Sequence, residues 1–196
     1  MAEQLNTGRL RHFLSELSAL VSRADGDEAL ILRDGADLLR DLVAVDDWLP
    51  AASAQGRPQG YQQHLLYCDP QERFSVVSFV WGPGQETPVH DHTVWGLVGQ
   101  LRGSERSIGY ELRDGRMTPT DDEVLKTGEV VAVSPRVGDI HKVSNAETDR
   151  DSISIHVYGA NIGAVRRHVF APDGTESTFI SGYSNATLPN IWGMAG

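Results

Sequence analysis

The sequence predicts a mainly β fold, a small antiparallel barrel or sandwich preceded by N-terminal α-helices. Apolar residues recur at helical spacing before residue 50, whereas short β-like runs separated by Gly, Pro and Asp fill the chain after residue 60. No long helical stretch separates these runs, as the crossovers of a parallel sheet would require. The 196 residues are enough for one domain with a sizeable core.

Two helices are expected in the first fifty residues. Apolar side chains recur every three or four positions over residues 10–21, and Asp25-Gly26 supplies a stop before a second stretch that runs through residues 38–43. Such stripes are packing faces, so we assign them no chemistry. Residues 50–60 are rich in Pro, Gly and small side chains, which is typical of a linker.

The β part is expected to begin after the linker. Strands are predicted over 74–81, 94–101, 130–133 and 152–158, and Asp114-Gly115 is typical of a hairpin turn because both residues tolerate positive φ. We therefore expect a single domain over residues 1–196, with a helical part at 1–49 and a barrel core at 61–196.

Composition and charge narrow the function classes. The 22 % charged and 40 % hydrophobic residues are globular proportions, and 27 acidic against 17 basic side chains give a net charge of −10. This charge repels phosphate backbones and anionic lipids, so neither nucleic acid nor a membrane is an expected partner. The single cysteine, Cys68, excludes an internal disulfide, and no segment reads as a signal peptide or a membrane span. We expect a cytoplasmic protein of undetermined oligomeric state.

Two histidines separated by one residue are the sharpest local feature. In a strand, His90 and His92 would project from the same face and form a bidentate metal clamp. For an isolated pair of this kind, a solvated strand edge is an equally good interpretation. The surrounding residues favour the clamp, because they form two ordered motifs: Gly84, His90, His92 and Gly103, followed by Gly128, Pro135, Gly138, His141 and Asn145.

This order resembles the paired motifs of the cupin superfamily. The spacing between Gly128 and Gly138 is longer than usual, and Gly96 stands where cupins usually carry a metal-binding Glu. The resemblance implies that a metal is held by three histidines, which are His90, His92 and His141. Three ligands with open positions are typical of a catalytic site, since structural sites are normally closed.

From Tyr61 onward the chain resembles the cysteine dioxygenase family. The resemblance is carried by residues 61–66, 77–82, 90–93 and 154–158, in the order that the family shows. It implies that the three histidines hold Fe(II), and that a thiol substrate and O2 react there to give a sulfinic acid. Gln63 stands where mammalian-type members carry Arg, as in a bacterial Gln-type subgroup that tends to prefer 3-mercaptopropionate or related mercapto-acids.

Ser154, His156 and Tyr158 alternate along a predicted strand and so share one face. A Ser-His-Tyr relay on that face could aim a phenol at the metal and set the imidazole tautomer. The alternative is a polar face in solvent, with the intervening apolar residues forming the only buried face. We favour the relay, because small barrels often line a pocket with the second face.

A substrate carboxylate needs a cation that Gln63 does not supply. Arg167 is the candidate, nine residues after Tyr158 as in the Gln-type pattern, and the adjacent Arg166 is expected at the surface. Gln63 and Arg167 are thus the predicted substrate-binding residues. His168 has no partner that the sequence indicates.

The resemblance to the cysteine dioxygenase family implies that this protein is a non-haem Fe(II) thiol dioxygenase. Its expected substrate is a small thiol carboxylic acid, 3-mercaptopropionate first, with L-cysteine and mercaptosuccinate as further candidates. Two alternatives stay open: a zinc-dependent hydrolase, since three histidines and water also suit Zn²⁺, and a non-catalytic cupin that binds a small anion.

Overall fold

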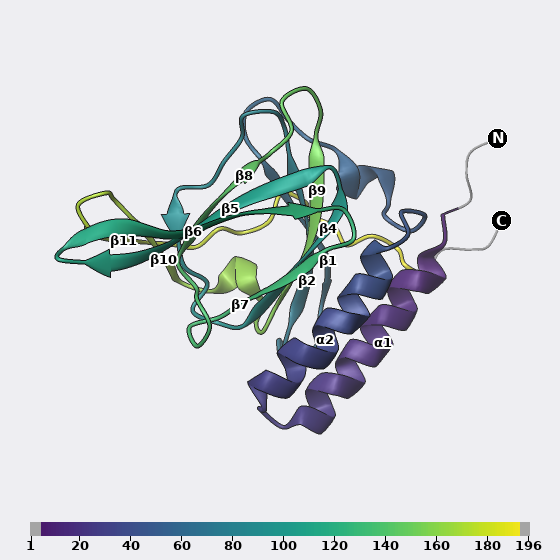
Figure 1. The fold of residues 1–196 in the computed structure, drawn as a ribbon. Coiled ribbons are helices and arrows are strands. Elements are labelled where there is room, and N and C mark those ends of the chain that lie inside the picture. The colour runs from purple at the N-terminus through teal and green to yellow at the C-terminus, as the bar shows by residue number, and fades with distance from the viewer. Residues whose placement is uncertain (1–4, 193–196) are drawn as a thin grey trace.

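Two antiparallel sheets pack face to face, and two helices cover the outer side of one of them (Figure 1). This computed structural model describes residues 5–192, so the first four residues and the last four of the predicted 1–196 domain lie outside the described part. The mainly β class with N-terminal helices is confirmed. Within the described residues, neither helix is long and apolar enough to cross a bilayer.

The helices occupy the predicted positions. Helix α1 (Thr7–Ala24) ends at Asp25, whose φ of 46° is left-handed, and α2 (Glu28–Val43) begins after Asp27, whose side chain accepts a hydrogen bond from the Leu30 amide. The predicted linker is partly ordered into a short 3-10 helix, η1 (Ala51–Ala54). This segment packs on the sheet, since its Ser53 carbonyl accepts a hydrogen bond from Ser78.

The first sheet has the strand order β1-β2-β9-β4-β7. Helix α2 lies so close to it that a Cβ at Gly99 would stand 2.9 Å from Leu39. The outward side chains of this sheet and the apolar stripes of both helices form the larger core. The strand bounds are β1 (Gln62–Cys68), β2 (Ser75–Trp81), β4 (Gly96–Arg102), β7 (Val130–Val133) and β9 (Ser152–Tyr158).

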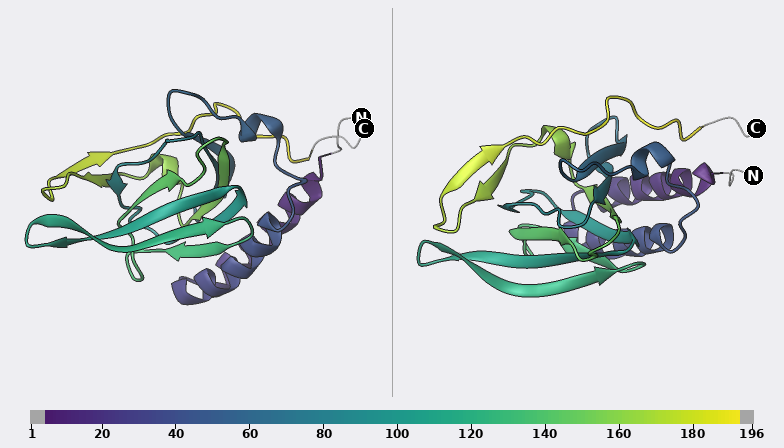
Figure 2. Two further views of the ribbon diagram at one scale, coloured as in Figure 1. Left: turned by 45° about the horizontal axis from the view of Figure 1, so that its top comes forward. Right: turned by 90° about the horizontal axis from the view of Figure 1, so that it is seen from above.

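The second sheet has the order β11-β10-β3-β8-β5-β6. The predicted hairpin turn is confirmed at Asp114 and Gly115, which both have positive φ between paired Arg113 and Arg116. The tips of the β5–β6 and β10–β11 hairpins extend past the body of the molecule (Figure 2). The bounds are β3 (Val89–His90), β5 (Ser104–Arg113), β6 (Arg116–Lys126), β8 (His141–Asn145), β10 (Arg167–Phe170) and β11 (Glu176–Phe179); a second short 3-10 helix, η2 (Ile162–Ala164), precedes β10.

Candidate metal centre and substrate pocket

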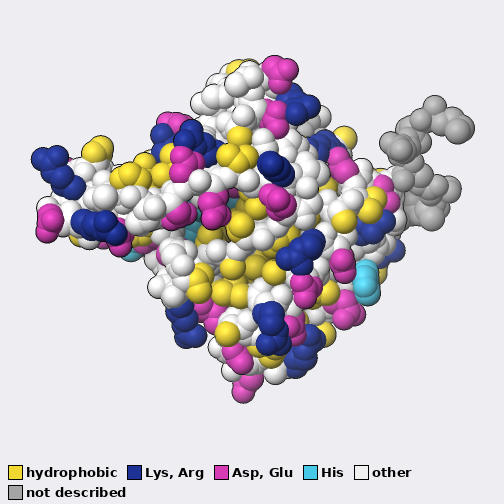
Figure 3. Space-filling model, in the orientation of Figure 1, with side chains coloured by type: hydrophobic (Ala, Val, Ile, Leu, Met, Phe, Trp, Pro, Cys, Tyr) yellow, Lys and Arg dark blue, Asp and Glu magenta, His cyan; other side chains and the backbone are white. Residues whose placement is uncertain are grey.

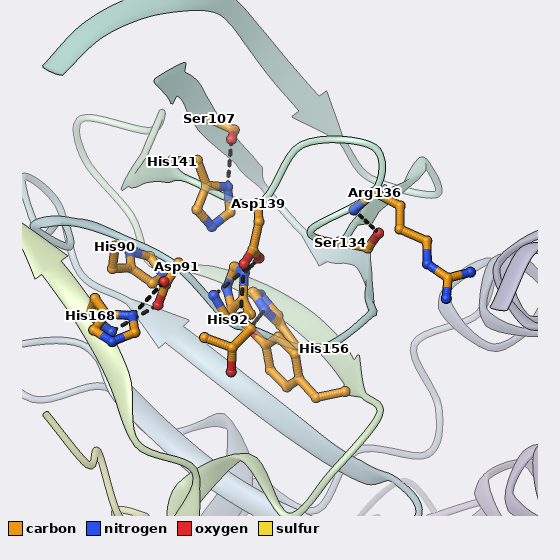
Figure 4. A network of polar contacts seen from close by, with 12 residues as sticks. His90, Asp91, His92, Ser107, Ser134, Arg136, Asp139, His141, His156 and His168 are labelled. Atoms are coloured by element: carbon orange, nitrogen blue, oxygen red, sulfur yellow. Dashed lines mark hydrogen bonds and ion pairs between the residues drawn. The ribbon is translucent and has the colours of Figure 1, made fainter. Parts of the chain in front are cut away.

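Three buried histidines meet between the two sheets (Figure 4). His90 ends β3 and pairs in register with His141, the first residue of β8, while His92 follows in the loop after β3. One nitrogen from each ring lies within 4.8 Å of the others. The structure therefore brings together the three residues that the two motifs predicted as metal ligands.

Each ring is oriented by a hydrogen bond at Nδ1, which leaves Nε2 to face the common centre. His141 Nε2 is buried without a hydrogen-bond partner among the described residues, as expected of an atom reserved for a metal. The Nδ1 contacts are His90 to the Pro88 carbonyl at 3.1 Å, His92 to Asp139 Oδ1 at 2.9 Å and His141 to Ser107 Oγ at 3.1 Å.

The electrostatics keep these rings neutral. Burial and the neighbouring imidazoles lower the pKa of all three, that of His90 to about 3. A neutral imidazole is the form that binds a metal, so the donor set fits an ion that accepts nitrogen ligands.

Asp139 anchors the loop that carries His92. Its Oδ1 accepts hydrogen bonds from the His92 ring and amide, and its Oδ2 accepts one from the amide of Thr93, whose φ is 62°. Burial opposes ionisation, but these hydrogen bonds lower the pKa of Asp139, which remains a carboxylate. Sequence reasoning missed this residue, although it lies inside the second motif, between Gly138 and His141.

The predicted relay residues form a continuous hydrogen-bonded chain on the inner face of β9. Ser154 Oγ lies 2.8 Å from His156 Nε2, and His156 Nδ1 lies 2.8 Å from the Tyr158 hydroxyl. The Tyr158 ring stacks on His92 with centroids 5.1 Å apart. Burial raises the pKa of Tyr158 far above its usual value, so its phenol is protonated.

A cavity of about 240 Å³ lies over the three histidines. Arg167 lines it and is only 4 % exposed, whereas the adjacent Arg166 faces solvent, as expected. The guanidinium donates to Ser181 at 2.6 Å and lies over the Phe179 ring, but its Nε has no hydrogen-bond partner among the described residues. None of the ion pairs in the described part of the chain involves Arg167. Within that part, Arg167 is thus a buried cation without an ion-pair partner.

Gln63 also lines the cavity. Its amide nitrogen donates to Ser181 Oγ at 2.8 Å and to the Gly182 carbonyl, so both of its hydrogens are engaged. Ser181 therefore links Gln63 to Arg167. Sequence reasoning missed this link, because Ser181 is 118 positions from Gln63 and 14 positions from Arg167.

His168, for which the sequence indicates no partner, is paired with Asp91 in the structure. Its Nδ1 lies 2.7 Å from Asp91 Oδ2, and its amide donates to Asp91 Oδ1 at 2.8 Å (Figure 4). Hydrogen bonding to the Asp91 carboxylate raises the pKa of His168. The pair ties β10 to the residue between two metal-site histidines.

Comparison with known proteins identifies a family whose model matches this chain. The family model described as cysteine dioxygenase type I matches residues 53–169, which contain every predicted site residue. The cysteine dioxygenase type 1 of Danio rerio is 25 % identical over 91 residues, a match that spans 44 % of this chain and 45 % of the relative.

Several solved structures are similar in fold. The protein TT1209 from Thermus thermophilus is 20 % identical, with a TM-score of 0.44 over 56 % of this chain and 91 % of that one. A Klebsiella pneumoniae protein with a double-stranded β-helix domain is 16 % identical, with a TM-score of 0.42 over 65 % and 90 %. The family model covers more than half of the sequence, so the chain belongs to the cysteine dioxygenase type I family.

Proposed function

We propose that this protein is a non-haem Fe(II) thiol dioxygenase that converts a small thiol carboxylic acid and O2 to the sulfinic acid. The observation that carries the proposal is one small cavity holding both a three-histidine face and an unpaired buried arginine. Membership of the cysteine dioxygenase type I family supports it.

His90, His92 and His141 would hold the iron through Nε2. When bound, iron supplies coordination positions for the thiol sulfur and the redox chemistry that joins dioxygen to it. The protein supplies the orientation: Asp139, Ser107 and the Pro88 carbonyl fix the three rings before any ion arrives.

Arg167 binds the substrate carboxylate. A buried guanidinium without a counter-ion gains most from an anionic ligand, and its free Nε hydrogen is available to one. Gln63 acts through Ser181 to hold this side chain, because its own amide hydrogens are engaged. The role of Gln63 is therefore one of positioning.

The cavity lining favours 3-mercaptopropionate over the other two candidates. L-Cysteine carries an ammonium group, and no Asp or Glu of the described chain lines the cavity to receive it. Mercaptosuccinate carries a second carboxylate, whereas Arg167 is the single Arg or Lys in that lining, among the residues described. A substrate with one carboxylate and no ammonium matches these charges.

Tyr158 orients the reacting groups from strand β9, whereas Arg167 lines the cavity from β10 of the other sheet. His156 holds its hydroxyl, and Ser154 holds His156 in turn. The phenol is therefore fixed beside the metal-site histidines, where its oxygen can accept a hydrogen bond from the substrate.

The test is oxygen uptake by anaerobically iron-loaded protein offered the three thiols in parallel, with the sulfinate quantified. We expect uptake matched to sulfinate and greatest with 3-mercaptopropionate. Arg167→Gln should raise KM roughly 10–100-fold, as loss of a charged hydrogen bond predicts, while Arg166→Gln at the surface leaves it unchanged. Absence of thiol-dependent uptake would overturn the proposal, and metal analysis would then separate a zinc enzyme from a binding protein.

A further inference from the structure

The relay on β9 continues to the opposite sheet. Ser154 Oγ donates to Glu105 Oε2 at 2.6 Å, and Glu105 on β5 is only 3 % exposed. Trp81 Nε1 also donates to Ser154 Oγ, at 3.1 Å. The proposed function makes no use of this buried carboxylate.

Glu105 gives the relay a direction. The Ser154 hydroxyl donates its single hydrogen to Glu105 Oε2, and the Trp81 indole N–H, which can only donate, gives one to Ser154 Oγ. Ser154 Oγ then accepts from His156 Nε2–H, and His156 Nδ1 is left to accept from the Tyr158 hydroxyl. Each hydrogen that Tyr158, His156 and Ser154 share within the relay therefore points away from the substrate cavity and toward Glu105.

The far side of Glu105 borders a second hollow, which we name the outer cleft. It has a volume of about 810 Å³, and its walls include Glu105, Val98, Leu125, Val131 and the exposed Glu123. Figure 3 shows a hollowed hydrophobic area on this face, over β6 and β7. Of the described residues that line the substrate cavity, only His141 also lines the outer cleft.

We propose that Glu105 is the terminal proton acceptor of a relay that carries the substrate's thiol proton to the outer cleft. This inference rests on the proposed function. The S–H bond breaks as Tyr158 Oη takes the proton and passes its own hydrogen to His156 Nδ1. The Nε2 hydrogen of His156 moves to Ser154, and that of Ser154 moves to Glu105. The net result is the transfer of one proton and no electrons. Water in the outer cleft then receives this proton from Glu105.

The first test uses metal-free protein, so it is independent of turnover. NMR of ¹⁵N-histidine-labelled protein should show His156 as a single neutral tautomer protonated at Nε2. In Glu105→Ala, Ser154 loses its acceptor, and we expect a mixture of both tautomers that formate returns to the single form. A wild-type tautomer protonated at Nδ1 would overturn the proposal.

The second test measures kcat/KM for the best thiol. Glu105→Ala should lower kcat/KM about 100-fold, which is within the range of proton-transfer catalysis. Added formate should raise the kcat/KM of this variant by at least about tenfold. Glu123→Ala is the matched control, because it removes an exposed carboxylate from the same cleft without touching the relay. If the alanine variant does not fold, Glu105→Gln takes its place, because it keeps the side-chain volume. It should show the same loss of kcat/KM.

The outcomes separate the two proposals. If wild-type protein consumes oxygen but the Glu105 variants have the same kcat/KM as Glu123→Ala, Glu105 is not the acceptor. The same conclusion follows if formate restores neither the single tautomer of His156 nor the rate in Glu105→Ala. If no thiol supports uptake by wild-type protein, the proposed function fails, while the tautomer measurement still decides the direction of the relay.

Discussion

The two faces of strand β9 are equally buried and chemically opposite. Ile153, Ile155 and Val157 point outward and join the core beneath α1 and α2. The residues that alternate with them, Ser154, His156 and Tyr158, point between the sheets and form the relay. Burial alone therefore does not separate core from site. The distinguishing property is that every inward polar group of the relay has a specific hydrogen-bond partner.

The two faces of β9 also have different roles: the outer face packs against the helices, and the inner face lines the substrate cavity. No described residue of α1 or α2 lines the substrate cavity, so the helices cover the outer face of the sheet and do not shape the site. Changes on the outer face should alter stability with little effect on chemistry, and changes on the inner face should do the reverse. The following substitutions test this division.

The largest effect is expected on the inner face, from His141→Ala. It removes the ring whose Nε2 is buried without a partner among the described residues, and two ligands then remain. We expect metal content, measured by elemental analysis, to fall to background and oxygen uptake to drop at least about 1000-fold. His12→Ala on the exposed face of α1 is the control. Normal iron content in the His141 variant would contradict the ligand assignment.

Ile155→Ala tests the outer face of the same strand. Ile155 is fully buried against the helices, and its truncation should lower the free energy of unfolding by about 2–5 kcal/mol. Chemical denaturation measures this change, with the exposed Ile180→Ala as control. Activity per folded molecule should stay within about twofold. A large loss of kcat at full folding would show that the faces are coupled.

The sequence predicted one part of this comparison better than the other. Alternation along β9 and the spacing of His90 and His92 are local patterns, so the relay and two ligands followed from them. The partners of these residues lie far along the chain: Asp139 is 47 positions from His92, and Glu105 is 49 from Ser154. Such pairs depend on which strands the topology brings opposite each other, which no local periodicity records.

Asp139→Asn is expected to have a smaller effect than either substitution above. The amide keeps the size of the carboxylate but loses its charge and presents one acceptor oxygen in place of two. Iron affinity, measured by competition with a chelator, should fall roughly 10–100-fold, with stability nearly unchanged. Asp149→Asn at the surface is the matched control. Unchanged affinity would mean that the His92 loop is held by its other contacts alone.

The smallest effect is expected at the edge of the outer face, where Asp69 after β1 binds Arg73, and Arg73 donates to Ser22 of α1. The hydrogen bond from Arg73 lowers the pKa of Asp69. Because this pKa is lower in the folded state, the stabilisation is present above the unfolded value near 3.9 and is lost as pH falls through the folded value.

Asp69→Asn should therefore lower Tm by roughly 2–4 °C at pH 7. The difference from wild type should shrink at pH values below about 4, where the wild-type carboxyl also takes up a proton. Thermal unfolding followed by circular dichroism at both pH values measures it, and oxygen uptake at 25 °C should not change. An equal Tm difference at both pH values would mean that the charge of Asp69 does not support the contact with α1, and that the outer face is held by its apolar packing alone.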